Sequence, residues 1–230
     1  MGFFKFYQSE QEQSDIFGEH ATYIKKLNKD ASKEHLKLIP FAVKYCINFI
    51  LRKPTKFNDG DLSDLMISID PSQGRFLFNQ IMVKKPKVVF EFGLSHGISA
   101  CYIGAALKRL GHGTLYSTEL ESKKIIAAKN NIQRLELSKQ IKILEGDVLK
   151  SVENFKHRID FVHMDGFPNL NLSVIQKLEP FLSDNALIIT DDVNLFKLEM
   201  KPYLKYMFNP QLYSSVILKN STGMMMSVKL

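Results

Sequence analysis

From Lys87 onward the sequence alternates short apolar runs with longer segments of helical periodicity, and this alternation is the feature that most restricts the fold. Val88–Phe92 is a short apolar run, and Ile98–Leu110 is a helical segment that ends at Gly111. Strands that alternate with helices imply crossover connections and a parallel sheet. Further strands are expected at residues 113–118, 141–144, 160–164 and 186–190, and further helices at residues 122–137 and 170–182.

The end of the chain departs from this rhythm. Leu212–Leu218 and Met224–Leu230 are two strand-like runs, and the residues between them, Asn220 to Gly223, form a typical hairpin turn sequence. The predicted fold is therefore α/β and doubly wound, of the Rossmann-like type. Its mostly parallel sheet has seven strands and finishes in a C-terminal antiparallel hairpin.

Residues 1–85 have a different texture, with helical patterns and no clear strand. They predict an N-terminal helical segment, followed by a domain over residues 86–230. Within the segment we expect an apolar helix face from Leu36 to Ile50, a short helix at residues 62–66, and a helix from Gln73 to about Val83 capped by Ser72. Four aromatic residues of this segment fit a core best, and an acceptor pocket or a dimer interface is the alternative; they are Phe41, Tyr45, Phe49 and Phe57. The charge pattern of the same helix gives little support for a position on a membrane surface.

Composition excludes several classes of protein. The chain has 230 residues, of which 45% are hydrophobic and 24% charged, as is usual for a soluble globular protein. The net charge is +7, but the basic residues occur only in short pairs, which favours a solvated surface over a nucleic-acid partner. Cys46 and Cys101 fit buried thiols in a reducing compartment. We expect a cytoplasmic protein without a transmembrane segment or a signal peptide.

A glycine turn follows the first strand and opens a helix. Glu91 lies at the strand end, and Gly93 and Gly97 allow a close approach of the backbone to a ligand. The order acid-x-Gly-x-x-x-Gly differs from the Gly-x-Gly-x-x-Gly order of dinucleotide sites. A carboxylate here would repel a pyrophosphate and would suit a cationic ligand such as an aminoacyl sulfonium. The alternative is a tight turn that binds nothing.

Further acids follow the later strands in order. Glu119 could accept both hydroxyl groups of a ribose, and Asp147, after Gly146, could receive an adenine amino group. Asp165 ends the fourth strand, and Asp191-Asp192 end the fifth. Because neighbouring strands lie about 5 Å apart, these acids can converge, and a divalent cation such as Mg²⁺ would neutralise them. Solvated acids at strand ends are the alternative.

Residues 66 to about 194 resemble the class I S-adenosylmethionine-dependent O-methyltransferases, the group of the catechol and caffeoyl-CoA O-methyltransferases. The similarity rests on the stretch from Met66 to Leu77, on the glycine turn Glu91 to Ser99, and on the acids that follow in order. The final hairpin agrees with the fold of that group. The first sixty or so residues are not part of this resemblance.

The resemblance implies S-adenosylmethionine as cofactor. Glu91 would bind its methionyl end, Gly93 would line it, Glu119 would hold the ribose and Asp147 the adenine edge. The stretch from Ile67 to Asp70 would close over the cofactor. The predicted cofactor contacts are Ile67, Ile69, Glu91, Gly93, Ser95, His96, Gly97, Ser99, Glu119, Leu120, Gly146, Asp147, Val148 and Asp165. The predicted metal ligands are Asp165, Asp191 and Asp192.

The implied reaction is methylation of a small hydroxylated acceptor, either aromatic or aliphatic, assisted by the cation. The third metal ligand of the family is usually Asn, so Asp192 is a departure. Relatives often carry a basic Lys after the fourth-strand acid, whereas this chain continues with Gly166-Phe167. The catalytic candidates are therefore Asp165 and His163, although His163 fits a buried structural role better than that of a base.

Two alternatives stay open at this point. One is a metal-independent N- or O-methyltransferase whose acceptor is set by the helical segment. The other is a non-catalytic Rossmann-like module that binds a nucleotide. The expected partner is a small-molecule acceptor, and a homodimer is compatible with the sequence.

Overall fold

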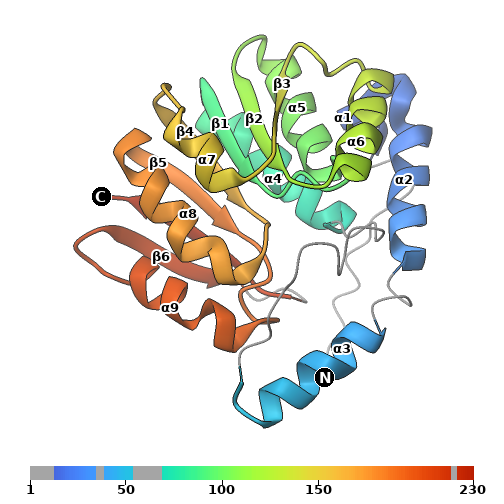
Figure 1. The fold of residues 1–230 in the computed structure, drawn as a ribbon. Helices are drawn as coiled ribbons and strands as arrows, with labels where there is room; N and C mark the ends of the chain where they lie inside the picture. Colours follow the sequence, from blue (N-terminus) through green and yellow to red (C-terminus); the bar gives the residue numbers. More distant parts are fainter. Residues whose placement is uncertain (1–12, 35–38, 54–68, 219–221) are drawn as a thin grey trace, which may run out of the picture.

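The computed structural model describes residues 13–34, 39–53, 69–218 and 222–230. Its centre is a seven-stranded sheet in the order β3-β2-β1-β4-β5-β7-β6 (Figure 1). Strands β1 to β5 are parallel, and β7 runs antiparallel to both β5 and β6, which confirms the predicted fold class. The strands are β1 (Val88–Phe92), β2 (Thr114–Glu119), β3 (Ile141–Glu145), β4 (Ile159–Met164), β5 (Leu182–Thr190), β6 (Tyr213–Leu218) and β7 (Met224–Lys229).

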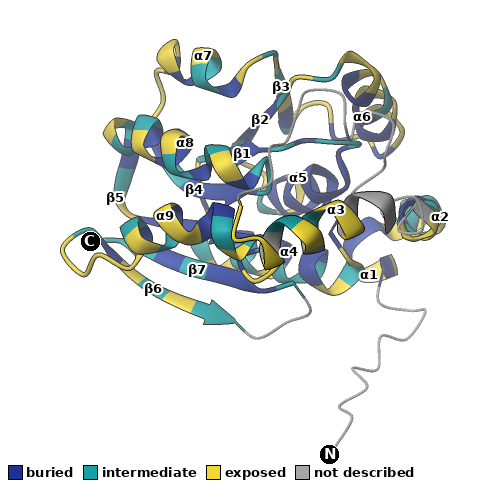
Figure 2. Ribbon diagram, turned by 60° about the horizontal axis from the view of Figure 1, so that its bottom comes forward, coloured by how far each residue is buried: buried dark blue, intermediate teal, exposed yellow. Residues whose placement is uncertain are grey.

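Helices cover both faces of the sheet, and the buried strands lie between them (Figure 2). One core cluster packs α4 and α5 on one face, and a second packs α8 and α9 on the other. The helices are α1 (Ser14–Phe17), α2 (Ala21–Glu34), α3 (Ile39–Ile50), α4 (Pro71–Lys84), α5 (Ile98–Leu110), α6 (Ser122–Arg134), α7 (Val148–Glu153), α8 (Asn171–Leu178) and α9 (Lys197–Met207). Short 3-10 turns occur at residues 18–20, 168–170 and 179–181. None of the described helices is long and apolar enough to cross a membrane.

Several element boundaries differ from the sequence-based expectation. The cap of α4 is Asp70 rather than Ser72, because Asp70 accepts the backbone N–H groups of Ser72 and Gln73 while Pro71 occupies the first helical position. Helix α9 was not predicted, since it contains Pro202, a residue that usually interrupts helices. The short helix α7 was also missed. The helix expected at residues 62–66 lies outside the described residues.

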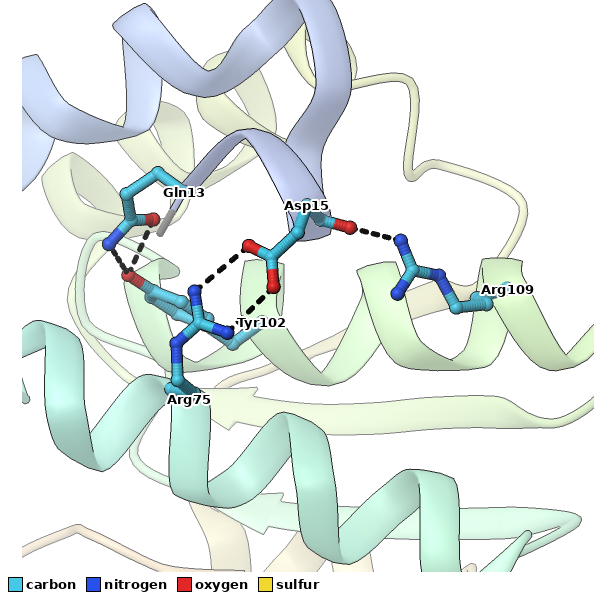
Figure 3. Close-up of polar contacts among 5 residues, drawn as sticks. All are labelled: Gln13, Asp15, Arg75, Tyr102 and Arg109. Carbon is cyan, nitrogen blue, oxygen red and sulfur yellow. Dashed lines mark hydrogen bonds and ion pairs between the residues drawn. The ribbon is translucent and has the colours of Figure 1, made fainter. Parts of the chain in front are cut away.

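The described start of the chain is fixed to α4 and α5 (Figure 3). The Arg75 guanidinium donates to both carboxylate oxygens of Asp15, at 2.8 and 2.9 Å. Arg109 donates to the carbonyl oxygen of Asp15, and the Gln13 amide hydrogen-bonds to the Tyr102 hydroxyl at 2.9 Å. These contacts hold α1 against α4, which precedes β1 and the glycine turn, and against α5, which follows the turn.

Candidate active site

The glycine turn lies at the carboxyl end of β1, where the ends of the five parallel strands share one edge of the sheet. Gly93 has φ +104°, and a Cβ atom there would stand 2.5 Å from the backbone oxygen of Asp165. The chain from β1 therefore passes against the end of β4 at a distance that only glycine allows. Gly97 precedes α5 with φ +80°, and Ser95 between them also has a positive φ of 48°. The turn is thus built as a tight connection between strand and helix.

Glu91 is fully buried, and its neighbours follow from the register of the sheet. It lies opposite Ser117 on β2 and opposite His163 on β4. The Ser117 hydroxyl donates to Glu91 Oε2 at 2.5 Å, and His163 Nδ1 lies 3.1 Å from Oε1. We expected this carboxylate to face a ligand at the turn, but its two oxygens instead contact the neighbouring strands. Its negative charge therefore lies beneath the turn, inside the sheet layer.

Glu119 ends β2 and reaches back to the glycine turn. Its Oε2 accepts the backbone N–H of Ser95 at 2.8 Å, and its Oε1 accepts those of Leu120 and Glu121 at 2.9 and 3.0 Å. The carboxylate is half-buried and held in place by three backbone donors. A group fixed in this way is suited to accept the hydroxyl groups of a ribose beside the turn.

Other predicted cofactor contacts lie along the same edge. Gly146 and Asp147 follow β3, and the exposed Asp147 carboxylate caps α7 by accepting the N–H of Leu149 at 2.7 Å. The carbonyl of His96 accepts from Asn131, a residue of α6. Among the rest, Ser99 and Val148 are buried, Leu120 is exposed, Ile69 is buried just before α4, and Ile67 lies outside the described residues.

Three carboxylates stand at the ends of β4 and β5, and each has a raised pKa. Burial is the main cause of the raised pKa of Asp165, and the charges of Asp191, Asp192 and Glu91 add to it. Burial also raises the pKa of Asp191, partly offset by the N–H of Asp192. The pKa of Asp192 is raised to about 7 by burial and by the charge of Asp191. Each carboxyl group thus favours its neutral form more than an exposed acid does.

Gln73 connects this acidic end of the sheet to α4. Its amide nitrogen donates to both oxygens of Asp191, at 2.9 and 2.7 Å, and its amide oxygen accepts the backbone N–H of Asp70 at 2.8 Å. The Thr222 hydroxyl donates to the same Asp191 at 3.2 Å. The Asp191 carboxylate is therefore already occupied by protein donors.

This arrangement does not fit a resident metal ion. In the part of the chain that the structure describes, no three His, Cys, Asp or Glu side chains are gathered so that they could hold one. Both oxygens of Asp191 accept from the Gln73 amide, a donor that competes with a cation. The predicted set Asp165, Asp191 and Asp192 shares an edge of the sheet without forming a three-ligand cluster.

The sequence interpretation missed Gln73, Ser117 and Thr222. A signal for Gln73 was present, because Asp70-x-x-Gln73 is the spacing of a capping box, which orients the glutamine toward the helix start. No comparable signal exists for Ser117 or Thr222, whose contacts depend on strand register. His163 is completely buried against Glu91, and its Nε2 makes no hydrogen bond to a described residue. This setting agrees with the structural role that the sequence favoured.

The known proteins that this chain resembles are methyltransferases. Residues 90–193 match the family model described as a methyltransferase domain. Catechol O-methyltransferase of Niastella koreensis is 28% identical over 131 residues, which cover 55% of this chain. The matched part spans 58% of the length of that relative.

Solved structures agree on the fold. An O-methyltransferase from Bacillus cereus, in complex with S-adenosylhomocysteine, superposes with a TM-score of 0.70 at 17% identity, covering 96% of each chain. The O-methyltransferase TomG of Streptomyces achromogenes, in complex with S-adenosylmethionine, gives a TM-score of 0.68 at 13% identity and covers 95% of this chain and 98% of TomG. Residues 90–193 therefore match a methyltransferase domain, and the chain resembles the class I O-methyltransferases in sequence and in fold.

Proposed function

We propose that the protein is an S-adenosylmethionine-dependent methyltransferase that methylates a hydroxyl oxygen of a small acceptor. The observation that carries the proposal is the extent of the methyltransferase match. It begins in β1 and ends at Val193, so it contains every strand end at which the sequence predicts a cofactor contact. The contact of Glu119 with the turn residue Ser95 adds support, because it fixes a carboxylate where a ribose would lie.

The bound cofactor would supply an activated methyl group on a positively charged sulfur. This methyl group would pass to the acceptor oxygen, and the electron pair of the carbon–sulfur bond would stay on the sulfur. The products are a methyl ether, S-adenosylhomocysteine and a proton. The protein contributes alignment, which can lower such a barrier by several kcal/mol, roughly 7 or more in the best cases. The glycine turn and Glu119 would hold the donor while residues at the ends of β4 and β5 face the acceptor.

Calorimetry with S-adenosylhomocysteine tests the proposal directly. We expect saturable binding in the micromolar range, and transfer of a labelled methyl group to members of a panel of catechols and other phenols. The absence of binding at millimolar concentration would refute the proposal and leave a non-catalytic module as the explanation.

A metal-independent reaction is the second candidate, and Gln73 favours it. The amide of this residue occupies Asp191, one of the three carboxylates that a cation-assisted mechanism would need. Asp192, with a pKa of about 7, is then suited to accept the acceptor's proton near neutral pH. Activity that survives a chelator supports this candidate. Activity that requires added magnesium and is lost in Asp165→Asn supports the cation-assisted form instead.

A further inference from the structure

Helix α3 turns an apolar stripe toward solvent. Val43, Ile47, Ile50 and Leu51 are 53%, 52%, 78% and 57% exposed. Val43, Ile47 and Ile50 are spaced by four and three residues, which places them along one side of α3, and Leu51 follows directly after the helix. Such a stripe normally packs on a core, so its exposure indicates that something outside the described structure covers it.

Helix α9 adds positive charge on the same part of the molecule. Lys197, Lys201 and Lys205 recur every four residues, which places them on one side of α9. With Leu204 and Phe208 they line an open cavity of about 420 Å³. None of the three lysines forms an ion pair or hydrogen bond with a residue that the structure describes.

The two helices form one surface, which we call the α3–α9 face. The rings of Tyr45 on α3 and Phe196 at the start of α9 meet edge to face, with centroids 5.2 Å apart. Figure 2 shows both helices on the near side of the molecule. Lys44, Arg52 and Lys53 are also exposed beside the apolar stripe.

Charge is concentrated on this face although it looks scattered along the sequence. Residues 39–53 and 193–208 contain six basic residues and a single acid, Glu199, which is buried. They therefore carry +5 of the chain's net charge of +7. Apolar side chains surrounded by exposed cations are the combination that binds an anionic lipid surface.

We propose that the protein docks peripherally on anionic membranes through the α3–α9 face. The apolar stripe of α3 enters the interfacial region of the bilayer, and the lysines of α9 contact the lipid head groups. A second copy of the chain fits this face less well, because a two-fold interface would bring the same basic residues opposite one another. Since α9 begins just after the end of β5, docking places the acceptor side of the site at the lipid surface. In combination with the proposed methyltransferase function, this predicts a hydroxylated acceptor that resides in the membrane.

Vesicle co-sedimentation tests the proposal without any assay of activity. The probes are vesicles of neutral phosphatidylcholine and vesicles in which about a quarter of the lipid is anionic phosphatidylglycerol. We expect the protein to bind the anionic vesicles at least about tenfold more tightly, and to be released by about 0.5 M salt. Equal binding to both vesicles, or none to either, overturns the proposal. Because S-adenosylhomocysteine binding is measured separately, failure here does not affect the proposed function.

Two pairs of substitutions separate the contributions to docking. Lys201→Glu with Lys205→Glu removes the cations, and Ile47→Glu with Ile50→Glu removes the apolar contact; each is expected to weaken vesicle binding about tenfold or more. The matched controls are Lys139→Glu with Lys156→Glu, and Val83→Glu with Ile126→Glu, which change exposed residues elsewhere and should leave vesicle binding intact. Equal losses in controls and test variants would contradict the proposal. So would an Ile47→Glu, Ile50→Glu variant that dissociates a dimer in sedimentation analysis while its vesicle binding is unchanged.

Discussion

The acidic side chains on the two halves of the sheet's carboxyl edge have different surroundings. On the donor side, formed by the ends of β1 to β3, the carboxylates of Glu91 and Glu119 are each bound by neutral or backbone donors. On the acceptor side, formed by the ends of β4 and β5, carboxylates crowd one another, and the pKa values of Asp165 and Asp192 are raised. The donor side is thus already ordered by the protein. The acceptor side holds charge that a ligand, a proton or an amide must balance.

This difference indicates which parts of the site agree with the resembled family and which parts depart from it. The glycine turn and the acids after β2 and β3 agree with the resembled family. Asp192, the missing lysine after Asp165 and the Gln73 contact all lie on the acceptor side. We therefore expect the cofactor to be shared with the family and the acceptor to be particular to this chain.

Gly93→Ala should give the largest effect, because Gly93 lies on the donor side with its backbone packed against the backbone of Asp165. A Cβ atom would stand 2.5 Å from the carbonyl of Asp165, at a φ of +104°. We expect a loss of stability of more than about 3 kcal/mol and no binding of S-adenosylhomocysteine. Denaturant unfolding and calorimetry measure both.

Gly111→Ala is the matched control for this substitution. Gly111 also has a positive φ, of 74°, but nothing lies within 4 Å of its Cβ position. Its replacement should cost only about 1 kcal/mol and preserve ligand binding. Equal costs at the two positions would show that close packing at Gly93 is unimportant.

Glu119→Ala should weaken S-adenosylhomocysteine binding by about 100-fold, since two charged hydrogen bonds to the ribose, each worth roughly 1.5 kcal/mol or more, would be lost. The control is Glu121→Ala, which removes a carboxylate two residues further along the chain and should leave the affinity within a factor of about two. A ribose-free fragment such as methionine should bind the wild-type protein and Glu119→Ala equally. If Glu119→Ala binds the full ligand normally, the ribose assignment is wrong.

Gln73→Leu tests the acceptor side. It removes the donors to both oxygens of Asp191 and leaves a buried carboxylate short of partners. We expect a loss of about 2 kcal/mol in the free energy of unfolding, and a gain in affinity for magnesium as the carboxylate becomes available. Gln140→Leu, at a position outside the edge, controls for the loss of an amide. Unchanged magnesium affinity would mean that Gln73 does not keep cations out.

Asp192→Asn should change stability by an amount that depends on pH, with a definite sign. The pKa of Asp192 is about 7 in the folded protein and near 3.8 when unfolded, so the folded state binds more protons between these values. Wild-type stability contributed by this group therefore falls as the pH rises from about 4 to 7. The variant cannot lose that proton, so its stability relative to wild type should be greater at pH 8 than at pH 5.

Thermal unfolding of both proteins at the two pH values checks this expectation. A relative stability of the variant that is the same at both pH values would show that the Asp192 carboxyl is ordinary.

Much of the fold could be predicted because strand and helix signals were local. Val88–Phe92 and Ile98–Leu110 were placed with their observed bounds, since an apolar run and a terminal glycine mark them. Helix α9 could not be, because Pro202 contradicts local propensity and only packing in the second core cluster stabilises the helix. In the site, the positions of the acidic residues could be predicted from the ends of the strands. The residues that hydrogen-bond to them could not be predicted in this way. The contact of Glu91 with His163 depends on the register between β1 and β4, which pairs residues 72 positions apart.

Helix α4 carries two residues, two positions apart, that each fix a distant part of the chain. Arg75 binds Asp15 in α1, near the first residues that the structure describes. Gln73, on the same turn of α4, binds Asp191 at the end of β5. A displacement of α1 would therefore be transmitted to the acceptor side through one turn of helix α4. Removal of the residues up to and including Asp15 would therefore remove one of the two contacts that position α4, the helix whose Gln73 holds Asp191 on the acceptor side.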